Sequence, residues 1–264
     1  FEKGAVLVGK DGTTMLLGGP ESEPFAKQSS AISDTRCFKA FMVPDEEYPN
    51  ATIIGFPELF AELNKKFPVK KVGLVGMGEM PYSVHQDILA GFAGCEVEDL
   101  TDEYLKLRYI KSDWEVEQAR AATQLCYKAY KAMMEKVKPG VKEYEVAAAG
   151  EAVCRAAGAN GFAYQTIVGS GERSDAVVPT ATNKEMKSGE MVMLGIAPRI
   201  NGYAGTFGHT VPVSGTYTPE QKKCLTDMIE VMQVTKSMLK IGNSGRQIDA
   251  AGRKLYDKGG YLKY

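Results

Sequence analysis

Histidine is scarce in this sequence, because His85 and His209 are the two histidines among 264 residues. Any acid–base role of histidine near neutral pH therefore falls to one of these two positions. Cysteine pairs are also lacking, since the five cysteines are far apart, odd in number and form no Cys-x-x-Cys spacing. This excludes the usual cysteine metal sites and predicts reduced, mostly buried thiols in a cytoplasmic protein.

An excess of either charge is lacking too, with 32 Lys and Arg residues against 33 Asp and Glu residues. We therefore expect no nucleic acid and no membrane as partner. No apolar run approaches the roughly 20 residues that a membrane-spanning helix needs. The composition, 44% hydrophobic and 25% charged, is that of an ordinary globular protein, and the length predicts one or two domains.

Short strands alternate with helices up to about residue 110, which predicts an α/β domain. The Asp11-Gly12 pair lies between two apolar runs and predicts a tight β-hairpin. The remaining elements predicted here are helices over 56–67, 81–92 and from Asp102, and strands over 72–76 and 95–97.

Longer amphipathic helices follow. Ser112 and Glu115 form a capping box in front of a helix that we predict over 113–137. Further elements are predicted along the chain: helices over 143–157, 218–240 and 247–258, and a strand over 164–168.

Residues 188–215 form the centre of the predicted fold. An apolar run over 191–194 is followed, after the Asn201-Gly202 turn, by an extended run over 203–213. Apolar runs on both sides of an Asn-Gly pair predict a β-hairpin.

This hairpin resembles the central hairpin of the creatinase, aminopeptidase P and prolidase family, the pita-bread enzymes. The sequence at Lys111-Ser112, Arg120-Ala121-Ala122 and Ser170-Gly171 is similar to that family as well. The resemblance implies an α/β (α+β) protein, with a creatinase-type N-terminal domain over 1–110 and the first half of a pita-bread domain over 111–264. It also implies a homodimer, and we expect the start of the first domain and the second half of the second to lie outside this sequence.

The metallopeptidases of that family bind two metal ions through two Asp residues of this hairpin, and a His in the preceding loop takes part in catalysis. When the family pattern is aligned with this sequence, the two Asp positions correspond to Gly195 and Thr206, and the His position corresponds to Val178. Glycine has no side chain, valine binds no ion, and a neutral hydroxyl is a poor substitute for a carboxylate on a divalent metal. We therefore predict that the chain has no metal centre and no cofactor.

The creatinase branch of the family works without metal, and Leu194, Pro198 and Thr210 resemble its hairpin. Creatinase relies on a His where this chain has Val178 and on a Glu where it has Gly208, which disfavours creatine as the substrate. The first hypothesis is a metal-independent hydrolase of a C–N or amide bond in a small polar substrate or short peptide. The alternative is a catalytically inert module that binds a peptide or protein.

Six residues near the hairpin are candidates for the site. His209 is the candidate catalytic residue, with a hydrogen-bonded structural role as the alternative. Arg199 could clamp a carboxylate or be a solvated turn residue. Tyr164, Tyr203 and Ser170 are further proposed substrate-binding residues, with core or rim packing as the alternative, or a tight turn in the case of Ser170. Thr206 is the last proposed substrate-binding residue.

Overall fold

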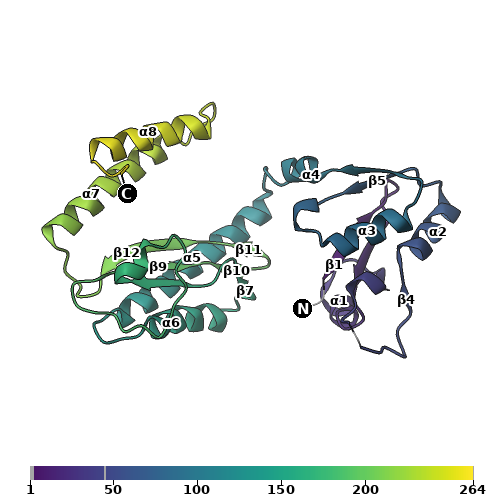
Figure 1. Cartoon of the computed structure of the whole chain (residues 1–264), viewed down its shortest axis with the longest axis horizontal. Helices are drawn as coiled ribbons and strands as arrows, with labels where there is room; N and C mark the ends of the chain where they lie inside the picture. Colours follow the sequence, from purple (N-terminus) through teal and green to yellow (C-terminus); the bar gives the residue numbers. More distant parts are fainter. Residues whose placement is uncertain (1–2, 45, 264) are drawn as a thin grey trace. The chain divides into compact units, whose positions relative to one another are not determined.

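The computed structural model describes residues 3–44 and 46–263, which form two compact units (Figure 1). The first unit ends at Ile110 and the second begins at Lys111. The first unit mixes short helices with two small sheets, and the second packs helices against two further small sheets. The α/β (α+β) class predicted from the sequence is therefore confirmed.

A four-stranded sheet in the order β1-β2-β3-β4 is the centre of the first unit. Its strands are β1 (Gly4–Val8), β2 (Thr14–Gly18), β3 (Thr35–Phe38) and β4 (Ile53–Ile54). The predicted Asp11-Gly12 turn joins β1 to β2 in an antiparallel pair, and Gly12 has a φ of 87°. The sequence pattern does not predict β3 and β4, which are short and held by parallel pairing with other strands.

Helices α2 and α3 cover the core of the first unit. The remaining elements are α1 (Glu23–Ser29), α2 (Phe56–Lys66), β5 (Lys71–Leu74), α3 (Tyr82–Gly91), β6 (Glu96–Asp99) and α4 (Thr101–Leu107). α2 and α3 approach so closely that a Cβ at Gly91 would lie 2.2 Å from the Cβ of Phe56. Apolar side chains from the sheet and from these two helices, among them Met15, Phe38 and Leu59, form one buried cluster.

Two long helices form one layer of the second unit, α5 (Asp113–Lys136) and α6 (Glu143–Ala156). The predicted capping box begins α5, because the Ser112 Oγ accepts from the Glu115 N–H and the Glu115 carboxylate accepts from the Ser112 N–H. Small residues let the helices approach, as predicted: a Cβ at Gly150 would lie 2.6 Å from Met133 Cγ.

Two small sheets form the other layer. One has the order β12-β9-β8, and the other has the order β11-β10-β7. The strands are β7 (Gly161–Phe162), β8 (Ile167–Ser170), β9 (Met191–Ile196), β10 (Pro198–Ile200), β11 (Tyr203–Ala204) and β12 (Phe207–Pro212). The predicted turn is present, with φ values of 49° at Asn201 and 84° at Gly202. The predicted single hairpin is divided into two ladders, because Ala197 and residues 205–206 interrupt the pairing.

The sheet β12-β9-β8 has one face toward α5 and α6 (Figure 1). Val192, Leu194 and Ile196 are at most 2% exposed and belong to the core shared with those helices. Side chains alternate along a strand, so Met193 and Gly195 belong to the opposite face. We call this opposite face, with Ile167 of β8 and Gly208 of β12, the outer face.

The helices α7 (Pro219–Ser237) and α8 (Gly245–Lys258) pack against each other. Thr218 caps α7 through the Gln221 N–H, as its Thr-Pro start predicts. Within residues 3–44 and 46–263, we find no helix with the length and apolar character that crossing a membrane requires.

Gly205 is the point where the hairpin meets the backbone of α5. A Cβ at this position would lie 2.5 Å from the backbone nitrogen of Thr123 and 2.6 Å from its Cα. We expect Gly205→Ala to destabilise the chain by about 2 kcal/mol or more, because a helix backbone cannot rotate out of the way. Equilibrium urea unfolding measures this change.

Gly208→Ala is the matched control on the same hairpin. A Cβ there would meet the carbonyl oxygen of Leu194 at 3.6 Å, an ordinary contact. We expect a change within about 0.5 kcal/mol. Equal destabilisation by the two substitutions would contradict the close approach at Gly205.

Candidate functional site

Two glycines lie side by side on the outer face. Gly195 of β9 pairs directly with Gly208 of β12 and, on its other side, with Ile167 of β8. Directly paired residues of antiparallel strands point to the same face. Gly208 is exposed and presents bare backbone, whereas Gly195 is buried, because the Ile167 side chain lies 3.1 Å from the position that a Cβ of Gly195 would take.

Two hydroxyl groups meet beside these glycines. The Tyr164 Oη and the Thr206 Oγ1 are 2.6 Å apart, and the Tyr164 Oη is 3.5 Å from the position that a Cβ of Gly195 would take. Tyr164 lies between β7 and β8, and Thr206 lies just before β12. One hydroxyl donates to the other, so the pair keeps one O–H donor and several lone pairs for a ligand. The arrangement can hold a carbonyl or carboxylate oxygen.

Tyr203 is engaged at the start of α5. Its Oη donates to Glu115 Oε1 at 2.8 Å, and its ring meets Trp114 edge-on with centroids 5.6 Å apart. The Ser112 N–H and then the Tyr203 hydroxyl lower the pKa of Glu115 below its usual value. Tyr203 thus ties the turn after β10 to α5. Arg199 is exposed on β10, opposite Ala204 and Gly161.

His209 lies on the helix-facing side of the sheet. It pairs with Leu194, whose side chain is in the core, so its ring points toward α5. The His209 Nδ1 is 2.6 Å from the Tyr130 Oη, and the Tyr130 ring packs on Phe207 with centroids 4.5 Å apart. Burial raises the pKa of the Tyr130 phenol, which leaves it protonated and able to donate at neutral pH.

The structure therefore separates two predicted site residues from Tyr164 and Thr206. His209 faces α5, while the two hydroxyls lie at the outer face. Ser170 pairs with Val192, is 0% exposed and donates its hydroxyl to Glu143 at 2.9 Å. A side chain in that position supports the loop after β8 and cannot touch a ligand without rearrangement.

The residues at the family's metal positions do not form a metal-binding donor set. Gly195 brings no side chain, and the Thr206 hydroxyl is hydrogen-bonded to the Tyr164 hydroxyl. Val178 has an apolar side chain that is 56% exposed. In the part of the chain that the structure describes, no group of three or more His, Cys, Asp or Glu side chains could hold a metal ion. The donors at the outer face are neutral oxygens, which suit a pair of divalent ions poorly.

Sequence reasoning missed Tyr130 and Glu143. Tyr130 lies on the buried side of α5 next to Ala129, so helical periodicity could have placed it near the sheet. Glu143 lies on the same face of α6 as Val146, Ala147 and Gly150. That spacing predicts burial, although an acidic residue in the first turn of a helix is normally read as an exposed end residue.

The contact between Tyr130 and His209 can be measured by a double-mutant cycle. We expect the variants Tyr130→Phe and His209→Ala to show a coupling free energy of about 1 kcal/mol in urea unfolding, because they share one hydrogen bond. Tyr127→Phe serves as the control, since Tyr127 is 51% exposed and its ring contacts Phe207 instead. If the coupling stays below about 0.3 kcal/mol for the Tyr130–His209 pair as well as for the Tyr127–His209 control pair, the placement of His209 against α5 is refuted.

Comparison with known proteins gives the family of the chain. Two curated relatives align over most of it: the uncharacterised peptidase YqhT of Bacillus subtilis is 27% identical, with 77% of this chain and 57% of that protein covered. The Xaa-Pro dipeptidase of Pyrococcus horikoshii is 24% identical, with 98% of this chain and 74% of that protein covered. The chain thus spans only part of the length of these relatives.

The fold is shared with solved structures. The X-Pro aminopeptidase of Thermotoga maritima superimposes with a TM-score of 0.84 at 21% identity, and the alignment covers 99% of this chain and 68% of that one. This likeness confirms the predicted pita-bread fold, of which the chain holds a part. The sequence profile of metallopeptidase family M24 matches residues 117–264, more than half of the chain. The chain belongs to metallopeptidase family M24.

Proposed function

We propose that the outer face binds a short peptide at the Tyr164–Thr206 hydroxyl pair. The observation that carries this proposal is the 2.6 Å contact between the two hydroxyls beside the glycine pair Gly195–Gly208. A peptide carbonyl or C-terminal carboxylate accepts the remaining O–H, and the exposed backbone of Gly208 allows the ligand to approach closely. Relatives named Xaa-Pro dipeptidase and X-Pro aminopeptidase make Xaa-Pro peptides the first class of ligand to test.

A binding module fits the described residues better than a complete catalytic site. Peptide hydrolysis needs an acid or base within reach of the scissile bond. His209 is turned toward α5, and the outer-face hydroxyls are neutral. This favours the second of the two hypotheses from the sequence.

Metal-independent hydrolysis of a C–N or amide bond is the second candidate. Membership of a peptidase family favours it. In that case Tyr164 and Thr206 orient the carbonyl, and the acid or base comes from outside the outer face described here. For the whole protein we further propose a cytoplasmic homodimer. We also propose that residues 1–110 are a creatinase-type N-terminal domain and that residues 111–264 are the first half of a pita-bread domain.

Removing the Tyr164 hydroxyl tests the binding proposal. We expect Tyr164→Phe to weaken the binding of an Xaa-Pro dipeptide about tenfold, because a neutral hydrogen bond contributes about 1 kcal/mol and Thr206 also loses its partner. Isothermal titration calorimetry measures the dissociation constant. Tyr203→Phe removes the same atom from a tyrosine bonded to Glu115, and it should leave the affinity unchanged. Equal losses in the two variants, or none in either, would rule out the site.

Metal titration separates the candidates from an ordinary metallopeptidase. We expect titration with Mn²⁺, Co²⁺ and Zn²⁺ to show no tight binding, because Gly195 and Thr206 supply no carboxylate. Two tightly bound ions per chain would overturn the proposal of metal independence. Turnover of Xaa-Pro dipeptides that survives a chelator would favour the hydrolase, and binding without turnover would favour the binding module.

A further inference from the structure

A fully buried carboxylate lies at the start of α6. Glu143 is the first residue of this helix and is 0% exposed. An ionised carboxylate is costly to bury unless it is paired and hydrogen-bonded. Its partners therefore show which part of the chain the carboxylate organises.

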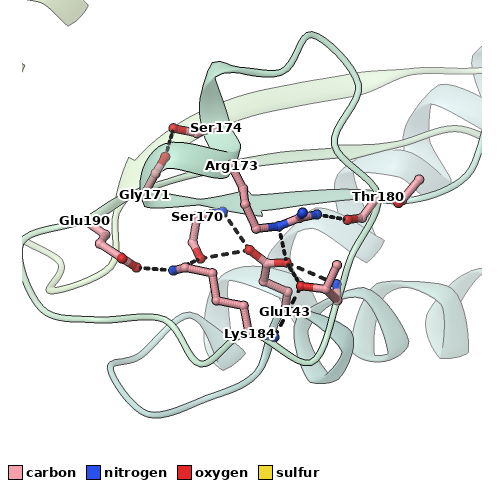
Figure 2. Close-up of polar contacts among 9 residues, drawn as sticks. Glu143, Ser170, Gly171, Arg173, Ser174, Thr180, Lys184 and Glu190 are labelled. Atoms are coloured by element: carbon pink, nitrogen blue, oxygen red, sulfur yellow. Dashed lines mark hydrogen bonds and ion pairs between the residues drawn. The ribbon is translucent and has the colours of Figure 1, made fainter.

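Five donors from the loop after β8 and from the end of β8 satisfy this carboxylate (Figure 2). The Oε1 accepts from the N–H and hydroxyl of Ser170 at 2.8 and 2.9 Å. The Oε2 accepts from the Arg173 Nε at 3.1 Å and from the N–H and hydroxyl of Thr182 at 3.0 and 2.7 Å. These residues belong to segments up to 39 positions distant from Glu143.

The backbone at the start of α6 holds the same loop. The first N–H groups of a helix have no partner within it. Here the Glu143 N–H donates to the Lys184 carbonyl and the Tyr144 N–H donates to the Thr182 carbonyl, both at 3.1 Å. The Glu143 side chain and the backbone at the helix end thus both bind the loop at Thr182.

Charged side chains around Glu143 extend this network. Arg173 reaches from Glu143 to the Thr180 carbonyl. Lys184 donates to the Ser170 hydroxyl at 2.8 Å and forms an ion pair with Glu190 at 2.7 Å (Figure 2). Two cations and two carboxylates balance, so the cluster carries no net charge.

The loop held in this way borders the outer face. Thr180 forms a β-bridge with Ile167, the neighbour of Gly195. Pro179 lies over Gly169, where a Cβ would come within 2.5 Å of its Cγ. Because Gly169 points to the outer face, the loop crosses onto that face here, and Val177 beyond it is 87% exposed.

We infer that Glu143 is a positioning residue, which fixes the loop over residues 171–187 so that its tip, Val177-Val178, forms an apolar border of the outer face. The position of the loop follows from the contacts above. The role of its tip rests on the proposed peptide site, where the two valines would contact an apolar side chain of the bound peptide. The positioning of the loop by Glu143 and the role of its tip in peptide binding can be refuted separately.

Charge neutralisation of Glu143 is the first test. Glu143→Gln keeps the shape but replaces one oxygen by an NH₂ group, so the two donors at Oε1 or the three at Oε2 lose their acceptor. We expect the amide hydrogens of Ser170 and Thr182 to exchange about a hundredfold faster or more, while the β9–β12 ladder keeps its protection. Glu172 is an exposed glutamate of the same loop, and Glu172→Gln is the matched control. It should change neither the loop exchange nor the protection of the ladder. Unchanged loop exchange in Glu143→Gln would overturn the inference.

The pH profile of loop exchange separates this role from general destabilisation. Burial alone raises the pKa of Glu143, but the bonds from Thr182 and Ser170 and the charge of Arg173 outweigh it and lower the pKa. The folded pKa lies below the unfolded one, so the stabilisation is present above the unfolded pKa and is lost as the pH falls through the folded pKa. Thr182→Val removes one donor, and we expect the midpoint of loop opening to move to higher pH. An unmoved midpoint would contradict control of the loop by the carboxylate.

Peptide binding tests the role of the loop tip. In proteins shown to be folded by the β9–β12 protection, we expect Glu143→Gln to weaken Xaa-Pro dipeptide binding about tenfold or more, and Glu172→Gln to leave it unchanged. Faster loop exchange with full affinity would refute the border formed by Val177 and Val178. Absence of binding by the unmodified chain would refute the proposed function and this border together, and the exchange data would still decide the role of Glu143 in the loop.

Discussion

The antiparallel pairing of β9 with β12 is the constraint on which the second unit depends. This register pairs Gly195 with Gly208 and Leu194 with His209. Because paired residues share a face and neighbours alternate, one register decides which side chains enter the core and which border a ligand. A slip by one residue would turn His209 outward. The burial of Leu194 and the close packing of Gly205 against the backbone of α5 oppose that slip.

The chemistry of the outer face follows from what this register places there. Two glycines and two neutral hydroxyls can orient a carbonyl or carboxylate oxygen, yet they cannot neutralise the charge of divalent ions as carboxylates do. A hydroxyl pair offers hydrogen bonds to a ligand, but it supplies no carboxylate or imidazole that could act as a general base. The same residues that make the face a reasonable peptide-binding surface therefore set a limit on the catalysis it can perform.

Local signals in the sequence predict most of the fold and less of the candidate site. The capping box at Ser112, the Asn201-Gly202 turn and the small residues of α6 act within a few positions, and the structure has all three. The face of the sheet on which His209 lies depends on its pairing with β9. Its partner could not be found by counting residues back from the Asn201-Gly202 turn, because Ala197 and Gly205 interrupt the pairing. The contact of Tyr164 with Thr206 joins residues 42 positions apart, which no local pattern reveals.

Glu143 shows how a carboxylate can persist in a fully buried position. With five donors, one of them the Arg173 guanidinium, the ionised form is compensated in the folded chain. Removing the carboxylate would leave several of these donors buried without an acceptor, which costs more than the bonds themselves contributed. The loop is therefore held by α6 and by β8, through hydrogen bonds in which neither Gly195 nor Thr206 takes part.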